Sequence, residues 1–133
     1  MEKIRIRIRG NEMPATLYDT PTAQRILEVL PLEGHVQVWG DEIYFSIPLI
    51  LDLEPDARQE VHVGELGYWP QGPAVCIFFG PTPASTSEAP KAFSPVNVFG
   101  KTDQDARVFK GVPSGAEIHV EPLSPDQRFY PES

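Results

Sequence analysis

Residues 74–79 form an apolar run, Ala-Val-Cys-Ile-Phe-Phe, without a polar side chain. Gly72-Pro73 precedes the run and Gly80-Pro81 follows it, and such Gly/Pro pairs mark turns. A short apolar segment between two turns is typical of a strand with both faces buried. We therefore expect residues 74–79 to be the innermost strand of a rolled sheet. A structure in which they form an unpaired edge would contradict this expectation.

The rest of the chain predicts further short strands. It contains 15 prolines in 133 residues, about twice the usual share of ~5%, which disfavours long helices. Alternating polar and apolar side chains predict strands at residues 3–9, 13–18, 35–39, 42–47, 60–63, 96–101 and 116–120. The first two should form a hairpin. This pattern favours a mainly β fold, a closed β-barrel of about eight strands or a sandwich, because closure removes exposed edges.

One main helix is predicted, at about residues 20–30. Thr20 can cap its N-terminus, and Pro21 fits the first helical position because no N–H is needed there. Pro31 ends it. A single apolar stripe follows the spacing i, i+3, i+4, i+7 and consists of Ala23, Ile26, Leu27 and Leu30. Such a helix should cover the sheet or one end of the barrel.

No linker or repeat divides the chain, so residues 1–133 are expected to form one domain. Residues 81–95 are rich in Pro, Ser, Thr and Ala and predict a long surface loop that is mobile or functional. Residues 122–133 predict a polar tail with Phe129 and Tyr130, draped on the body or frayed.

Charge and composition limit the classes of binding partner that are expected. The net charge of −8 makes this an acidic protein and disfavours nucleic acid as a partner. No apolar span approaches the ~20 residues that cross a bilayer, so no membrane partner is expected. One cysteine, Cys76, excludes an internal disulfide, and the N-terminus is not a secretory signal, so we expect a cytoplasmic protein. A homodimer stays open.

Basic side chains gather in the first strand, at Lys3, Arg5, Arg7 and Arg9. The favoured interpretation is the solvated face of an edge strand, where positive charge discourages pairing between molecules. The alternative is a small basic strip that meets an anion or an acidic patch.

Three blocks carry a family resemblance: Gly67-Tyr68-Trp69-Pro70-x-Gly72, Cys76-Ile77-Phe78-Phe79-Gly80-Pro81-Thr82-Pro83 and Ser94-Pro95-Val96-Asn97-Val98-x-Gly100-Lys101. With the order of strands and helix, the chain resembles the small prokaryotic cyclophilin-like family over nearly its whole length. The resemblance implies a cyclophilin-type β-barrel, generally without an assigned activity. Classical cyclophilins isomerise X-Pro bonds with an arginine and a glutamine followed by two phenylalanines. Here Phe78-Phe79 follows Cys76-Ile77, so no catalytic residue is transferred.

Other chemistry finds little support in the sequence. His35, His62 and His119 lie in separate predicted strands and should point away from the core, so a metal site is the minority interpretation. Cys76 is better explained as a small core side chain than as a nucleophile. No glycine-rich phosphate loop precedes a helix, so no cofactor is predicted.

A binding surface is the favoured functional hypothesis. Rigid turns that show hydroxyl and amide groups beside an apolar floor suit an extended peptide or a small molecule. The candidate ligand-binding residues are Tyr44, Tyr68, Trp69, Phe79, Thr82, Pro83, Ser94 and Asn97. The alternatives are that these aromatic residues are simply core and that Thr82 and Asn97 satisfy backbone groups in turns. A peptidyl-prolyl cis-trans isomerase with a non-standard active site, or a purely structural role, also stays open.

Overall fold

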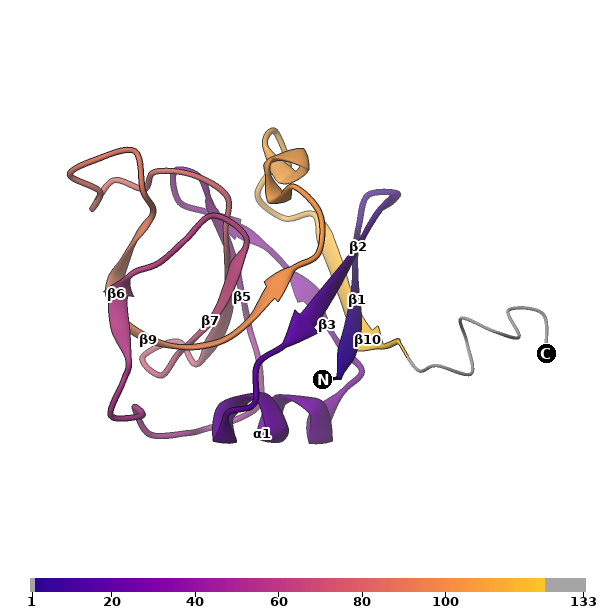
Figure 1. Ribbon diagram of the computed structural model, residues 1–133. Coiled ribbons are helices and arrows are strands. Elements are labelled where there is room, and N and C mark those ends of the chain that lie inside the picture. Colours follow the sequence, from indigo (N-terminus) through magenta and orange to yellow (C-terminus); the bar gives the residue numbers. More distant parts are fainter. Residues whose placement is uncertain (1, 124–133) are drawn as a thin grey trace.

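The structure, a computed structural model, describes residues 2–123 and is mainly β (Figure 1). The predicted tail with Phe129 and Tyr130 lies outside the described residues. In chain order the elements are β1 (Lys3–Ile8), β2 (Asn11–Leu17), α1 (Pro21–Val29), β3 (Leu32–His35), β4 (Gln37–Val38), β5 (Glu42–Ser46), β6 (Arg58–Glu60), β7 (Glu65–Trp69), β8 (Ala74–Phe78), β9 (Lys91–Thr102), the 3-10 helix η1 (Ala106–Phe109) and β10 (Glu117–Pro122).

The apolar run occupies the interior of the sheet, as predicted. Its strand β8 pairs antiparallel with β5 on one side and with β7 on the other, so that Cys76 lies opposite Tyr44 and Gly67. All five residues of β8 are buried. A run without polar side chains suits this position because both faces of the strand contact other apolar groups.

The sheet curls into a barrel whose hydrogen-bonded ladder stays open at one seam. The strand order is β3-β10-β1-β2-β9-β7-β8-β5-β4, with β6 added to β9. The two ends, β3 and β4, are consecutive in the chain, and Val36 between them bonds to the backbone of Gly115 and Ala116. The mainly β prediction is confirmed. Among residues 2–123, β3 and β4 are not paired with each other by a hydrogen-bonded ladder. The seam between them is crossed by the chain itself at Val36.

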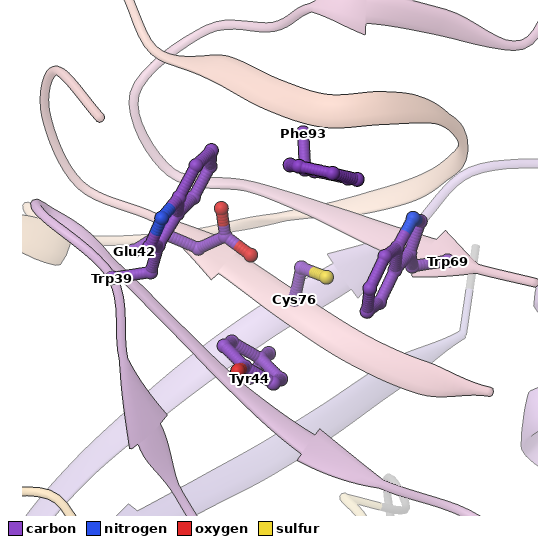
Figure 2. A pocket seen from close by; sticks show the side chains of 6 residues that line it. All are labelled: Trp39, Glu42, Tyr44, Trp69, Cys76 and Phe93. Atoms are coloured by element: carbon purple, nitrogen blue, oxygen red, sulfur yellow. The ribbon is translucent and has the colours of Figure 1, made fainter. Parts of the chain in front are cut away.

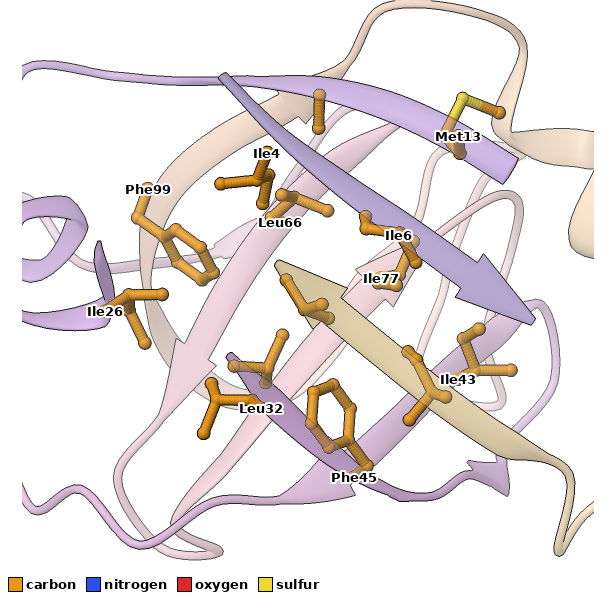
Figure 3. Packing of buried hydrophobic residues seen from close by; sticks show 14 of the residues in the cluster. Ile4, Ile6, Met13, Ile26, Leu32, Ile43, Phe45, Leu66, Ile77 and Phe99 are labelled. Atoms are coloured by element: carbon orange, nitrogen blue, oxygen red, sulfur yellow. The ribbon is translucent and has the colours of Figure 1, made fainter. Parts of the chain in front are cut away.

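Inward-pointing side chains fill the barrel (Figure 3). Every second residue of β1 is buried, at Ile4, Ile6 and Ile8, which is the result of strand alternation. The predicted hairpin is confirmed, since β1 pairs antiparallel with β2. Burial of each large aliphatic side chain contributes ~1.5–3 kcal/mol.

The predicted helix is confirmed as α1. The Thr20 hydroxyl accepts a hydrogen bond from the Ala23 N–H at 3.1 Å, and Pro21 stands at the first helical position. Ile26 projects into the core, so α1 covers one end of the barrel (Figure 3). It has nine residues, and no helix among those described is long and apolar enough to cross a bilayer.

The outer face of β8 is also covered, by a second apolar cluster. Cys76 and Phe78 point outward and pack with Val61, Ala92 and Val96 from the segments that follow β6 and begin β9. Gly67 on β7 permits this approach, because a Cβ there would lie 2.8 Å from a methyl group of Val96. The barrel wall is therefore sandwiched between two apolar layers at this point.

Several local predictions were wrong. The strand predicted at residues 60–63 lies at residues 58–60 as β6, and β7 was not predicted. The basic strand β1 is not an edge, because β10 and β2 flank it. Its basic side chains meet acidic partners within the same chain: Lys3 pairs with Asp103 at 2.7 Å, and Arg5 pairs with Glu121. The long loop ends earlier than predicted, because β9 begins at Lys91 and takes residues 91–95 into the sheet.

Candidate functional site

An open pocket lies on the outer face of the barrel wall, with a volume of about 140 Å³. Six residues from five places in the chain line it: Trp39, Glu42, Tyr44, Trp69, Cys76 and Phe93. Trp39 lies in the turn before β5, and Phe93 lies near the start of β9. Figure 2 shows the two indole rings on opposite sides, with the Glu42 carboxyl and the Cys76 sulfur between them.

Strand alternation explains why these side chains meet. On β5, Ile43 and Phe45 point into the barrel, so Glu42 and Tyr44 point outward. The same period sends Val75 and Ile77 of β8 inward and Cys76 outward. Because β8 lies between β5 and β7, these outward positions lie side by side.

The aromatic rings around the pocket pack against each other edge to face. Trp69 lies at the centre of this arrangement, with ring centroids 6.2 Å from Tyr44 and 6.0 Å from Phe93. Phe93 also meets Trp39 at 6.0 Å. The Trp69 Nε1–H donates a hydrogen bond to the Ser94 hydroxyl at 2.7 Å, which fixes the indole and uses its only donor. Such contacts contribute ~0.5–1.5 kcal/mol each beyond burial.

Glu42 brings a carboxyl group into this apolar setting. The residue is only 5% exposed, and its Oε1 has no hydrogen-bond partner among residues 2–123. Burial raises the pKa of Glu42 to about 7, although a hydrogen bond with Cys76 acts in the opposite direction. Burial, and then the nearby Glu42 charge, raises the pKa of the Cys76 thiol as well. The thiol is therefore protonated at neutral pH, which argues against a nucleophilic role.

A second buried carboxyl, that of Glu65, is fully paired. Arg58 donates two hydrogen bonds to it at 3.1 Å, and the Tyr18 hydroxyl and the His62 N–H donate others at 3.0 and 2.8 Å. Burial raises the pKa of Glu65, but these donors outweigh it and leave the pKa below its ordinary value. This group joins β6 to β7 and is structural.

The structure brings only part of the predicted binding set together. Tyr44 and Trp69 line the pocket, and Ser94 holds the Trp69 ring. Thr82 and Pro83 do not line it, but they pack against Gly40, beside the turn that carries Trp39.

The other three predicted residues lie elsewhere. Phe79 and Tyr68 point into the barrel core, where the Tyr68 hydroxyl donates to the Leu49 carbonyl at 2.7 Å. The Asn97 amide donates to Thr22 Oγ1 and to the Asp52 carbonyl, both at 3.0 Å. Its oxygen accepts from the Glu54 N–H at 2.8 Å. Asn97 therefore ties β9 to the start of α1, as in the alternative interpretation of a satisfied polar group.

Sequence reasoning missed Trp39, Glu42 and Phe93 as pocket residues and described Cys76 only as core. Alternation does place Glu42 and Tyr44 on one outward face, which was the available signal. It does not show that this face is covered by a distant segment.

Metal ligands do not gather in the described part of the chain. Across residues 2–123 no three His, Cys, Asp or Glu side chains lie close enough to hold an ion. His35 and His62 are exposed, and His119 Nδ1 lies 3.5 Å from a Glu33 oxygen.

Comparisons with known proteins agree with this architecture. A sequence model described as Cyclophilin-like matches residues 2–121. The chain belongs to the Cyclophilin-like family. This confirms the resemblance and the cyclophilin-like fold class predicted from the sequence. No curated protein matches the chain.

A solved structure is similar over most of the chain. It is the solution structure of a hypothetical protein from Archaeoglobus fulgidus, with 34% sequence identity and a TM-score of 0.77. The similarity covers 92% of this chain and 95% of that one. Since that protein is itself described as hypothetical, the likeness carries the fold and no activity.

Proposed function

We propose that this cyclophilin-like protein binds a small organic molecule in the pocket between Trp39 and Trp69. The observation that carries this proposal is a hollow lined by four aromatic rings with one buried carboxyl at its floor. Ligand sites are typically apolar hollows with few polar groups that set orientation.

Size favours a small molecule over an extended peptide. The volume of about 140 Å³ resembles an engineered cavity of ~150 Å³ in another protein that admits one benzene ring. An extended peptide would need several such subsites in a row. The predicted alternatives of a peptide ligand and of a purely structural role therefore receive less support.

The isomerase alternative lacks a supporting group at this site. None of the arginines between residues 2 and 123 lines the pocket. Arg58 is engaged with Glu65, and Arg25 and Arg107 lie beside Glu28 and Asp105. We expect no acceleration of cis-trans exchange in Xaa-Pro peptides by NMR, even at high protein concentration. Acceleration that persists in a Trp69→Phe variant would assign isomerase activity to another site.

Binding can be tested directly because both tryptophans of the chain line the pocket. A panel of compounds with about five to eight heavy atoms is screened by ¹H–¹⁵N NMR. Hits should shift both indole N–H signals and the amide signals of Glu42 and Cys76.

A matched pair of variants provides the control. Phe93→Ala removes a pocket ring that is 65% exposed, so it should weaken hits at least fivefold without unfolding the protein. Val108→Ala truncates an exposed apolar side chain on η1 and should leave binding unchanged. A panel without hits, or hits that map away from the indoles, would contradict the proposed function.

A further inference from the structure

One oxygen of the Glu42 carboxyl, Oε1, has no hydrogen-bond partner among residues 2–123. A buried polar group without a hydrogen bond costs free energy, and a buried charge costs more unless it is paired. Among the lining residues none is Lys, Arg or His, and the titratable ones besides Glu42 are Cys76 on β8 and Tyr44 on β5. The described residues that line the pocket therefore provide no cation for this carboxyl, and a ligand can.

The rings point to the same kind of ligand. The negative faces of aromatic rings attract cations, Trp most strongly, and several rings around one hollow are the usual way to hold a methylated ammonium group. Here two Trp, one Tyr and one Phe surround the carboxyl (Figure 2). Rings and carboxyl thus favour positive charge at one point.

The hydrogen-bonding capacity of the pocket limits how many N–H groups the cation can carry. Among the fully buried side-chain atoms of residues 2–123, Glu42 Oε1 is the one acceptor without a partner. The indole of Trp69 is a donor only, and it already bonds to Ser94. A primary ammonium has three N–H donors, so burial there would leave donors unsatisfied. A tertiary ammonium has one N–H, which matches the free oxygen, and its methyl groups suit the rings.

We infer that the pocket takes a methylated organic ammonium ion, with its single N–H donated to Glu42 Oε1 and its methyl groups against the rings of Trp39, Tyr44, Trp69 and Phe93. This inference deepens the proposed function and rests on it. Trimethylammonium and similar ions also fit the volume of about 140 Å³. The net charge of −8 attracts cations in general.

The test is a titration of tryptophan emission at pH 8 and constant ionic strength. The probes are trimethylammonium, methylammonium and tert-butanol, which is a neutral molecule of about the same size and shape as trimethylammonium. We expect trimethylammonium to bind at least tenfold more tightly than either of the others. Equal or tighter binding of tert-butanol would overturn the ammonium assignment and leave the proposed function standing. Absence of binding by all three would also overturn it, while the wider compound panel judges the proposed function separately.

Two variants with the same change of charge locate the effect. Glu42→Gln should remove the preference for trimethylammonium over tert-butanol. Glu2→Gln, at an exposed carboxyl, should keep it. Retention of the preference in Glu42→Gln would overturn the role of Glu42. The comparison of the three probes on the wild-type protein does not depend on whether a variant folds.

A blocked tripeptide that carries dimethyl-lysine offers the same tertiary ammonium on a protein side chain. If it binds more tightly than trimethylammonium, the ligand is a modified protein; if it binds more weakly, the ligand is a free amine. Either order supports ammonium recognition. Failure of both would contradict it.

Discussion

The two buried glutamates of the barrel wall occupy similar depths and have opposite surroundings. Glu42 is 5% exposed and Glu65 is 3% exposed. Glu65 accepts hydrogen bonds from Arg58, Tyr18 and His62, and its pKa is lowered. Glu42 has a bare oxygen among aromatic rings, and its pKa is raised to about 7.

The difference shows that burial alone does not decide what a carboxyl does. Donors from three residues, Arg58, Tyr18 and His62, fix Glu65 and make it part of the fold. Glu42 retains unused capacity to bind a proton or a cation, and it faces a hollow open to solvent. In this protein the unpaired carboxyl, and not the paired one, marks the candidate site.

The largest expected effect concerns stability and pH. The pKa of Glu42 rises from 4.5 in the unfolded chain to about 7 in the fold, so the fold favours the protonated carboxyl. The contribution of this preference to the free energy of unfolding is fully present below pH 4.5. It is lost as pH rises through 7. The loss is on the order of 3 kcal/mol, at about 1.4 kcal/mol per pKa unit.

Urea unfolding of the wild type and of Glu42→Gln from pH 4.5 to 8 measures this loss. The variant should lack it and should be more stable than the wild type at pH 8. Glu2→Gln is the control and should keep the wild-type slope. Identical pH profiles of stability for wild type and Glu42→Gln would contradict the proposed difference between the two glutamates.

Glu65→Gln should lower the stability of the protein, whereas Glu42→Gln should raise it. Loss of the charge leaves Arg58, Tyr18 and the His62 N–H poorly paired. Removal of one partner of a buried pair typically costs 3–5 kcal/mol, and we expect about 2 kcal/mol because Arg58 is partly exposed to water. Since the pKa of Glu65 is lowered, its contribution is present above about pH 4.5 and lost as pH falls. Urea unfolding at pH 7 should show the cost, and an unchanged midpoint would mean that the network contributes nothing.

A smaller effect is expected at Ser94, which orients the pocket through Trp69. Ser94→Ala removes the partner of the indole N–H and should cost ~1 kcal/mol. Denaturant unfolding measures the cost. In a Trp69→Phe background, which has no N–H to satisfy, the same substitution should be nearly neutral. A full cost in that background would show that Ser94 acts through other contacts.

The smallest effect concerns the Cys76 thiol. Burial is the main cause of its raised pKa, and the Glu42 charge adds to it. Alkylation of native protein by iodoacetamide at pH 8 should be slow, and Glu42→Gln should speed it only a few-fold. Glu2→Gln, which removes an exposed charge outside the pocket lining, should not change the rate. Equal acceleration by both variants would indicate general loosening of the wall.

Much of the fold could be predicted from local patterns. The period of two in β1 predicted its buried isoleucines, the apolar run predicted the central position of β8, and Thr20 and Pro21 predicted the start of α1. These signals are strong because each depends on neighbours in sequence. The start of β9 was missed because Pro95 normally opposes strand structure, and here it falls where the pairing with β6 is irregular.

The candidate site depends on contacts between distant residues, so less of it was predictable. Tyr44 and Trp69 were predicted to bind because they are aromatic and near turns. Glu42 looked like an ordinary solvent-facing residue of an alternating strand. Phe93 lines the pocket around that carboxyl from a segment that was interpreted as loop. No local pattern encodes such a long-range contact.

The most direct test of this account is an NMR titration of the Glu42 side-chain carboxyl in the free protein, with Glu65 observed in the same spectra. We expect Glu42 to titrate near pH 7 and Glu65 below its ordinary value. A Glu42 midpoint near 4.5 would contradict the buried, unpaired carboxyl and the cation pocket inferred from it.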